Sequence, residues 1–312
     1  MTSRSPSDLA LLTELEPIVE SNLNRHLSTA KEWFPHEYVP WSEGRTFDGI
    51  LGGEAWDPSQ SKLSDVARTS LIVNLLTEDN LPSYHHEIAV RFGRDGAWGT
   101  WVHRWTAEEG RHGIAIRDYL LATRAVDPVA LERARMQHME GGFTSDYESV
   151  LGGIAYVSFQ ELATRVAHRN TGRISDDPIC DQLLARVAAD ENLHMLFYRN
   201  LLGGAFDFAP DQAMQAVLDV ITSFQMPGHT IDGFQRKSVQ IAMAGIYDLR
   251  IHHDEVVMPI VRQLRVFERT GLSGEGERAR EELAAFLEGL DQAASKFVER
   301  REKTNARKAA RA

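Results

Sequence analysis

Two short stretches of the chain combine a carboxylate and a histidine at a spacing that could hold a metal ion. Glu109 and His112 form one Glu-x-x-His motif, and Glu191 and His194 form a second. On an α-helix, residues three apart lie about one turn apart on the same face, so each pair can present both groups to one ion. One motif alone carries little weight, because a chain with 12 histidines is expected to contain about one by chance.

Two further glutamates stand at matched distances from these motifs. Glu78 precedes Glu109 by 31 residues, and Glu161 precedes Glu191 by 30. In an antiparallel helix pair, the chain can run about 13 residues along the first helix, cross a short loop and return about 13 residues along the second. At ~1.5 Å per residue, the first and last residues of this path then lie at the same height in the bundle. Two such pairs packed together form a bundle with six inward ligands. We predict that the metal ligands are Glu78, Glu109, His112, Glu161, Glu191 and His194.

Four carboxylates and two imidazoles suit two iron or manganese ions, because both metals accept oxygen and imidazole ligands. Iron is the expected choice for chemistry on O2. The neighbouring positions support an inward orientation of these helix faces. Apolar residues recur every three or four positions around Glu109 and around Glu161. A carboxylate on such a face is costly unless it is paired or bound to a metal.

The elements that must position these residues all read as helices, because strand-type alternation is nearly absent. Pro82 should bend or break the second helix. The segment 33–57, rich in tryptophan and glycine, is expected to wrap over the helices. We expect helices at about 9–29, 61–92, 97–123, 128–140, 146–170, 178–202, 210–224, 231–249, 255–270 and 273–304.

This pattern predicts an all-α protein that forms a single domain over residues 1–312. Its core would be a ferritin-like di-iron four-helix bundle over about 61–202. The additional helices, over about 210–304, would pack against that core. No stretch of the sequence reads as a linker between two domains.

Composition excludes several other classes of protein. The net charge of −11 argues against nucleic acid as a partner. No apolar run approaches the ~18 residues that a membrane span requires. The first 20 residues lack the basic and apolar blocks of a secretory signal. Cys180 is the only cysteine, so no intrachain disulfide can form, and we expect a cytoplasmic protein.

The residues around the candidate ligands resemble the soluble acyl-carrier-protein desaturase family. The resemblance runs from about Trp33 to Glu277 and includes positions outside the metal motifs. Gly110 and Asn192-Leu193 depart from the family pattern, and the loop between the first two ligand helices is shorter than in plant members. The matching stretches are Thr77–Tyr84 (TEDNLPSY), Trp105–Gly113 (WTAEEGRHG), Ser158–Thr164 (SFQELAT), Arg169–Thr171 (RNT), Ala189–Glu191 (ADE), Met226–His229 (MPGH) and Thr270–Ser273 (TGLS).

This resemblance implies a homodimer that takes an acyl chain bound to acyl carrier protein. It implies insertion of a cis double bond with O2 and two electrons from ferredoxin, at two iron ions held by the six residues above. It further implies that Thr164 lies near the oxygen-binding face. Trp33 and Asp190 would lie on the electron route to the His112 side.

Two other functions remain open from the sequence. A di-iron oxygenase that hydroxylates or N-oxidises a carrier-bound substrate could use the same ligands, and so could a ferritin-type iron-handling protein. The helices expected after Leu202 argue against the ferritin type. Because acyl carrier protein is acidic, docking requires a local basic patch. The candidates for that patch are Arg165, Arg169, Arg173, Arg236 and Lys237.

Overall fold

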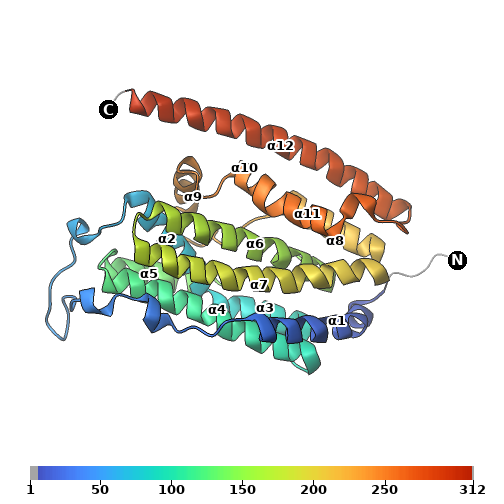
Figure 1. Cartoon of the computed structure of the whole chain (residues 1–312), viewed down its shortest axis with the longest axis horizontal. Helices are drawn as coiled ribbons and strands as arrows, with labels where there is room; N and C mark the ends of the chain where they lie inside the picture. Colours follow the sequence, from blue (N-terminus) through green and yellow to red (C-terminus); the bar gives the residue numbers. More distant parts are fainter. Residues whose placement is uncertain (1–5, 311–312) are drawn as a thin grey trace.

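A computed structural model describes residues 6–310 of the chain (Figure 1). Within these residues the regular secondary structure is helical, and the one β-bridge joins Phe47 to Glu54. The all-α prediction is therefore confirmed. None of the helices in this part of the chain combines the length and the apolar character that crossing a bilayer requires.

Four helices form the bundle that carries the predicted ligands. They are α2 (Asp65–Asp79), α4 (Gly96–Ala122), α6 (Val150–Ile174) and α7 (Pro178–Phe208). Helix α2 packs on α4 and α6, and α7 packs on the same two helices. Figure 1 shows α6 and α7 side by side along the long axis of the molecule. Three of these helices begin at a side chain that accepts a free backbone N–H: Ser64, Ser149 and Asp177.

The expected helix over 61–92 is divided into α2 and α3 (Leu81–Phe92), with Asn80 between them. The predicted break at Pro82 is confirmed. Pro82 has no N–H to donate to the carbonyl of Glu78, so the regular hydrogen-bond pattern stops there. The break at Asn80 comes two residues after Glu78. The chain can therefore leave the ligand helix and continue in a new direction.

The remaining helices cover the bundle. Helix α1 (Asp8–Thr29) packs along α7 and α4, and α5 (Pro128–Gly141) packs on α2. Helix α8 (Pro210–Ser223) lies on α6 and α7, and α12 (Gly274–Ala309) packs on α8. One buried apolar core includes side chains from α1, α3, α4, α6, α7, α8 and α12.

The helices expected at 231–249 and 255–270 are wrong in extent. The first is α9 (Phe234–Met243), which is followed by a turn with Gly245 at φ +75°. The second region is divided into α10 (Leu249–Ile251), the π-helix η4 (His252–Val257), α11 (Met258–Leu264) and the 3₁₀ helix η5 (Val266–Glu268). Pro259 cannot donate to the carbonyl of Glu255, and Arg265 ends α11 in the left-handed region at φ 54°.

The segment 33–57 contacts the helices near its start and again at Arg124, just after α4, whose guanidinium donates to backbone carbonyls on both sides of the projecting loop. Trp33 is buried, and the 3₁₀ helix η1 (Pro35–Tyr38) packs on α4 and α7. The 3₁₀ helix η2 (Trp41–Glu43) follows, and η3 (Pro58–Gln60) precedes α2. Ile50 and Leu51 are exposed, and Figure 1 shows this loop projecting from the bundle. The expectation that this segment wraps over the helices is therefore wrong for the part around Ile50 and Leu51.

Candidate metal centre

The six predicted ligands meet in the interior of the bundle. They form two groups whose ligand atoms lie within 4.8 Å of one another. One group contains Glu78 and His112, the other contains Glu161 and His194, and Glu109 and Glu191 belong to both. All six side chains are buried. Two shared carboxylates between two histidines are the arrangement that a pair of metal ions requires.

Both imidazoles present the same nitrogen to the carboxylates. His112 Nδ1 lies 3.2 Å from Glu191 Oε1 and 3.4 Å from Glu109 Oε2. His194 Nδ1 lies 2.7 Å from Glu109 Oε1 and 3.6 Å from Glu161 Oε2. The Nε2 atoms point away from the cluster. Each ring can therefore offer Nδ1 to a metal while Nε2 carries the proton.

The side chains themselves leave this cluster unsatisfied. Buried polar atoms usually have hydrogen-bond partners, and atoms without one are costly. Although His194 Nδ1 is close to Glu109 Oε1, the two do not meet with hydrogen-bond geometry. On the inner side of the cluster, the ligand atoms without a hydrogen-bond partner are Glu109 Oε1, His112 Nδ1, Glu161 Oε2, both carboxylate oxygens of Glu191, and His194 Nδ1. His112 Nε2, on the outer side, also lacks a partner. The inner atoms can all coordinate a metal, so the residues fit a metal centre.

Charge leads to the same conclusion. Burial, together with the Glu109 and Glu161 carboxylates, raises the pKa of Glu191 well above its usual range. Burial alone would lower the pKa of His194, but the carboxylates of Glu108 and Glu109 raise it well above its usual value. Without metal, the side chains of the cluster therefore bind protons, which reduce its negative charge. Two divalent cations would neutralise the four carboxylates and replace those protons.

The outer face of His112 contacts Asp190. The His112 Nε2 atom lies 3.5 Å from Asp190 Oδ2, which also accepts the indole N–H of Trp33 at 2.7 Å and a guanidinium N–H of Arg111 at 3.2 Å. Arg186 pairs with the other oxygen of Asp190. Burial opposes ionisation of Asp190, but His112, Trp33 and Arg186 together lower its pKa to about 2. Asp190 is therefore a fixed anion beside His112.

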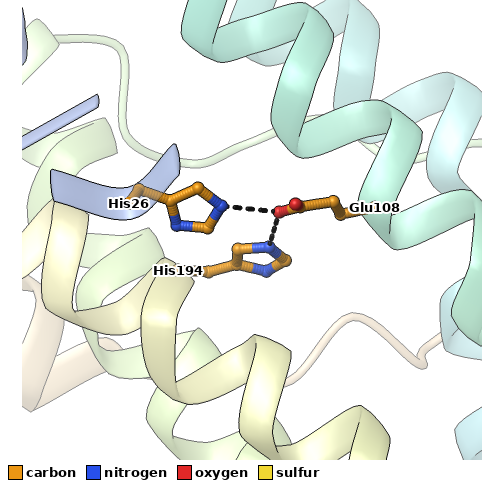
Figure 2. Close-up of side chains that lie close together, drawn as sticks. All are labelled: His26, Glu108 and His194. Atoms are coloured by element: carbon orange, nitrogen blue, oxygen red, sulfur yellow. Dashed lines mark hydrogen bonds and ion pairs between the residues drawn. The ribbon is translucent and has the colours of Figure 1, made fainter. Parts of the chain in front are cut away.

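The outer face of His194 has a different set of partners, shown in Figure 2. Its Nε2 atom lies 3.0 Å from Glu108 Oε2, and the same oxygen lies 2.8 Å from Nε2 of His26 on α1. The other Glu108 oxygen pairs with Arg104 at 2.5 Å. Burial raises the pKa of Glu108, but the hydrogen bonds from His194 and His26 outweigh it and hold the pKa well below its usual value.

Two ligand carboxylates have outer partners of their own. His168 Nε2 lies 2.7 Å from Glu78 Oε1, and Asn74 lies 3.2 Å from the other nitrogen of that ring. The indole N–H of Trp105 donates to Glu161 Oε1 at 3.0 Å. Buried partners of this kind hold metal ligands in one orientation.

Sequence reasoning assigned no role to Glu108, His26 or His168. A signal for Glu108 was present, because an acidic residue stands directly before the motif glutamate in both halves: Glu108-Glu109 and Asp190-Glu191. Adjacent residues on a helix point about 100° apart. The acid that precedes each motif glutamate can therefore face the histidine of the other motif. His26 and His168 had no comparable signal, since each meets its partner only through the packing of separate helices.

A largely apolar cavity opens beside the ligands. Glu78, Glu109 and Glu161 line one end, together with Thr164. The Thr164 hydroxyl donates to the Gln160 carbonyl at 3.0 Å and lies 2.9 Å from the Gln160 amide nitrogen. The other walls are mainly apolar: Leu81, Tyr84, Ile88, Phe92, Trp105, Phe143, Tyr156, Val157, Met226 and Pro227. An elongated apolar substrate could therefore lie against the metal centre.

The five basic residues predicted as a docking patch do not gather at one place. Arg165, Arg169 and Arg173 line one surface cavity between α6 and α7. Arg169 is paired there with Asp181 at 2.5 Å. Arg236 and Lys237 lie on α9 and are absent from that cavity. Only the first three remain candidates for a common binding surface.

The chain matches the model of the fatty acid desaturase family over residues 7–312. It is 55% identical over 299 residues to DesA1 of Mycobacterium tuberculosis, which carries acyl-ACP desaturase in its name (ACP, acyl carrier protein), covering 93% of this chain and 88% of that protein. It is 30% identical over 318 residues to a chloroplastic stearoyl-ACP 9-desaturase of Simmondsia chinensis, covering 96% and 78% of the two chains.

A solved structure shows the same arrangement of helices. The X-ray structure of the acyl-ACP desaturase homologue DesA2 from Mycobacterium tuberculosis matches with a TM-score of 0.66 at 34% identity. The match covers 82% of this chain and 99% of that one. With a family match over nearly its whole length and relatives of this similarity, the chain belongs to the fatty acid desaturase family and is an enzyme of the desaturase class.

Proposed function

We propose that this enzyme uses O2 and two iron ions to introduce a cis double bond into a fatty acyl chain carried on acyl carrier protein. One observation carries the proposal: a cluster of four buried carboxylates and two imidazoles, with unpartnered donor atoms, lies at the end of an apolar cavity. In the balanced reaction the acyl chain loses two hydrogen atoms. O2 takes these together with two electrons and two protons and becomes two water molecules.

The two iron ions would be held by Glu78, Glu109, His112, Glu161, Glu191 and His194, and Glu109 and Glu191 belong to both groups of ligand atoms. Bound iron would supply the oxidising power that removal of hydrogen from an unactivated methylene requires. Asp190 and Glu108 would orient the imidazoles of His112 and His194 through their Nε2 atoms. His168 and Trp105 would do the same for Glu78 and Glu161.

The walls of the cavity would bind the acyl chain and exclude water from the reacting carbons. The Thr164 hydroxyl lies on that wall, and the side chain is buried one helical turn after Glu161. Thr164 would therefore be the side chain placed to donate or accept a proton at the cavity face of the centre. Trp33 and Asp190 would form the electron route to the His112 side, because the indole N–H and the carboxylate are 2.7 Å apart.

Acyl carrier protein is proposed as the substrate carrier because the relatives are named acyl-ACP desaturases. The family resemblance alone supports ferredoxin as the electron donor and a homodimer as the assembly. A cytoplasmic location is supported by the single buried cysteine, whose pKa burial raises to about 12. A protonated, enclosed thiol of this kind needs no oxidising compartment.

A product assay tests the reaction. The iron-loaded protein is incubated with ferredoxin, its reductase, O2 and saturated acyl-ACPs, and the products are weighed by mass spectrometry. Desaturation yields a chain that is lighter by two hydrogen atoms. A product heavier by one oxygen atom would instead establish a di-iron oxygenase. Iron uptake without either product, combined with assembly into a cage, would favour a ferritin-type protein.

Iron analysis tests the metal site separately. The wild type should bind two iron ions per chain after anaerobic loading, and Glu109→Ala should lose both, because Glu109 belongs to both ligand groups. Glu140→Ala is a control for the effect of removing a glutamate, since this side chain is exposed on α5. One zinc ion per chain, or no iron after loading, would contradict the assignment.

A further inference from the structure

An ion pair lines part of the apolar cavity. Glu87 and Arg91 stand one turn apart on α3, and Arg91 NH2 lies 3.6 Å from Glu87 Oε2. Their side chains are only 19% and 15% exposed. Buried charges are retained only when they are paired, and an apolar cavity gains no binding strength from them. The position of this pair in the wall therefore points to a role in what the cavity accepts.

The pair and the metal ligands line separate parts of the cavity. Helix α6 lines the cavity from Gly153 to Thr164, and the ligand Glu161 lies near the second of these positions. Arg91 packs against the first, since a Cβ atom built on Gly153 would lie 2.8 Å from Arg91 Cδ. Eight residues separate Gly153 from Glu161. This distance corresponds to about 12 Å along the helix axis.

The surrounding backbone holds the pair in place. Glu87 Oε2 accepts the backbone N–H of Ser145 at 3.3 Å, which ties α3 to the loop before α6. Gly153 leaves the space that the aliphatic part of Arg91 occupies. The pair thus bridges α3, α6 and the loop across the end of the cavity. A side chain anchored on three sides acts as a wall, whereas a free arginine would turn towards solvent.

We propose that the Glu87–Arg91 pair ends the acyl compartment and limits how long a segment of the acyl chain can extend beyond the metal centre. This inference rests on the proposed function. The segment concerned is the methyl end, because the lining between the ligands and the pair is mainly apolar and suits no polar carrier arm. A methyl group pressed against the pair would displace the polar contacts of both charges and return no hydrogen bond.

The test replaces the wall and measures chain length. Arg91→Leu removes the charge and keeps a good helix former, and Glu87→Gln/Arg91→Leu also removes the carboxylate left unpaired. Arg94→Leu is the control, because Arg94 is an exposed arginine just after α3 and does not line the cavity. Each iron-loaded protein receives a mixture of saturated acyl-ACPs of graded length, and kcat/KM is compared between chains.

We expect the wild type and Arg94→Leu to share one length limit, beyond which each further methylene lowers kcat/KM about tenfold or more. Both Arg91 variants should move this limit to longer chains. The position of the double bond, counted from the carbonyl carbon, should stay the same. An unchanged length profile in both variants would overturn the proposal. So would a shift of the double bond at constant length, because the carbonyl side of the chain would then meet the pair.

Binding without turnover separates this inference from the proposed function. The same acyl-ACPs are added to the iron-loaded proteins without an electron donor, and the rise in melting temperature is recorded. If the wild type desaturates no chain, the proposed function fails. The pair still sets the limit if the Arg91 variants alone are stabilised by the longer chains. Equal stabilisation of all the proteins by every chain rejects the role of the pair.

Discussion

An imidazole that binds a metal through one nitrogen is oriented by what its other nitrogen contacts. His112 and His194 both turn Nε2 towards an acid from the opposite motif, but the two acids are held differently. Asp190 is held by Trp33, Arg111 and Arg186. Glu108 is held by Arg104 and by His26. The two halves of the centre are therefore alike in their ligands and unlike in their support.

His26→Leu should weaken iron binding on the His194 side. Without the His26 ring, which lies 2.8 Å from Glu108, that carboxylate is free to turn towards Arg104 and away from His194. We expect a loss of about tenfold in affinity for one of the two iron ions, within the range typical for partners of metal ligands. Anaerobic iron titration, followed by absorption and by iron analysis, measures this change.

Two comparisons accompany this variant. Ser28→Ala, at an exposed position on the same helix, should bind iron as the wild type does. His26→Gln keeps a side-chain donor that can reach Glu108 and should recover part of the affinity. Equal iron affinity in His26→Leu and the wild type would remove His26 from the support of the centre.

At the scale of the element, the break between α2 and α3 lets one stretch of sequence provide both a metal ligand and a wall of the cavity. Helix α2 ends one residue after the ligand Glu78, and α3 then provides six residues of the cavity wall from Leu81 to Phe92. A continuous helix would carry these residues in the direction of α2. Pro82 prevents this by removing the hydrogen bond to the Glu78 carbonyl.

Helix α7 carries two ligands, and its start depends on one side chain. Asp177 accepts the N–H groups of Ile179 and Cys180 at 2.8 and 3.0 Å and the hydroxyl of Tyr119 at 3.1 Å. Asp177→Ala should lower the free energy of unfolding by about 1–2 kcal/mol, the usual cost of losing a helix cap. Urea unfolding of the iron-free protein, followed by circular dichroism, measures the change.

The conservative variant tests the reason for this loss. Asn caps a helix as well as Asp does, so Asp177→Asn should retain most of the stability. If Asp177→Asn loses as much as Asp177→Ala, the negative charge accounts for the effect and capping does not.

At the scale of the whole molecule, one apolar core joins the bundle to α8, α11 and α12. A core shared in this way supports the prediction of a single domain over residues 1–312. The helices after the bundle also bring titratable groups into the interior. His252, in η4, stacks on Phe224 with ring centroids 5.0 Å apart, and its Nδ1 lies 2.8 Å from the Tyr247 hydroxyl.

Burial, with a smaller contribution from His253, lowers the pKa of His252 from 6.5 to about 4. Between these two pH values the unfolded chain binds a proton at this position and the folded chain does not. Stability should therefore fall as the pH decreases from about 6.5 to 4, by on the order of 3 kcal/mol from this residue. Urea unfolding of the iron-free protein at pH 7.5 and pH 4 measures the loss.

His252→Gln provides the comparison, because glutamine stays neutral over this range. Its stability should depend less on pH than that of the wild type. Other histidines and carboxylates titrate equally in both proteins, so the difference isolates His252. Parallel curves for the two proteins would show that His252 gains its proton in the folded state at its ordinary pKa.

The sequence by itself determined the helical class and the identity of the six inward residues. Helical spacing places Glu109 with His112 and Glu191 with His194 on one face, and a hairpin of about 30 residues returns Glu78 and Glu161 to the same level. These are local rules, because they depend only on helix geometry and on short loops. The break at Pro82 belongs with them, since a proline acts on its own helix.

Only the tertiary structure decided what surrounds these residues. The contacts from His26 to Glu108 and from His168 to Glu78 join residues 82 and 90 positions apart. The pairing of Glu87 with Arg91 is local, but its place opposite Gly153 at the end of a cavity is not. Helix packing angles and loop paths fix such contacts, and no periodicity in one segment reports them. The chain thus encodes its predicted ligands locally and their support through the fold.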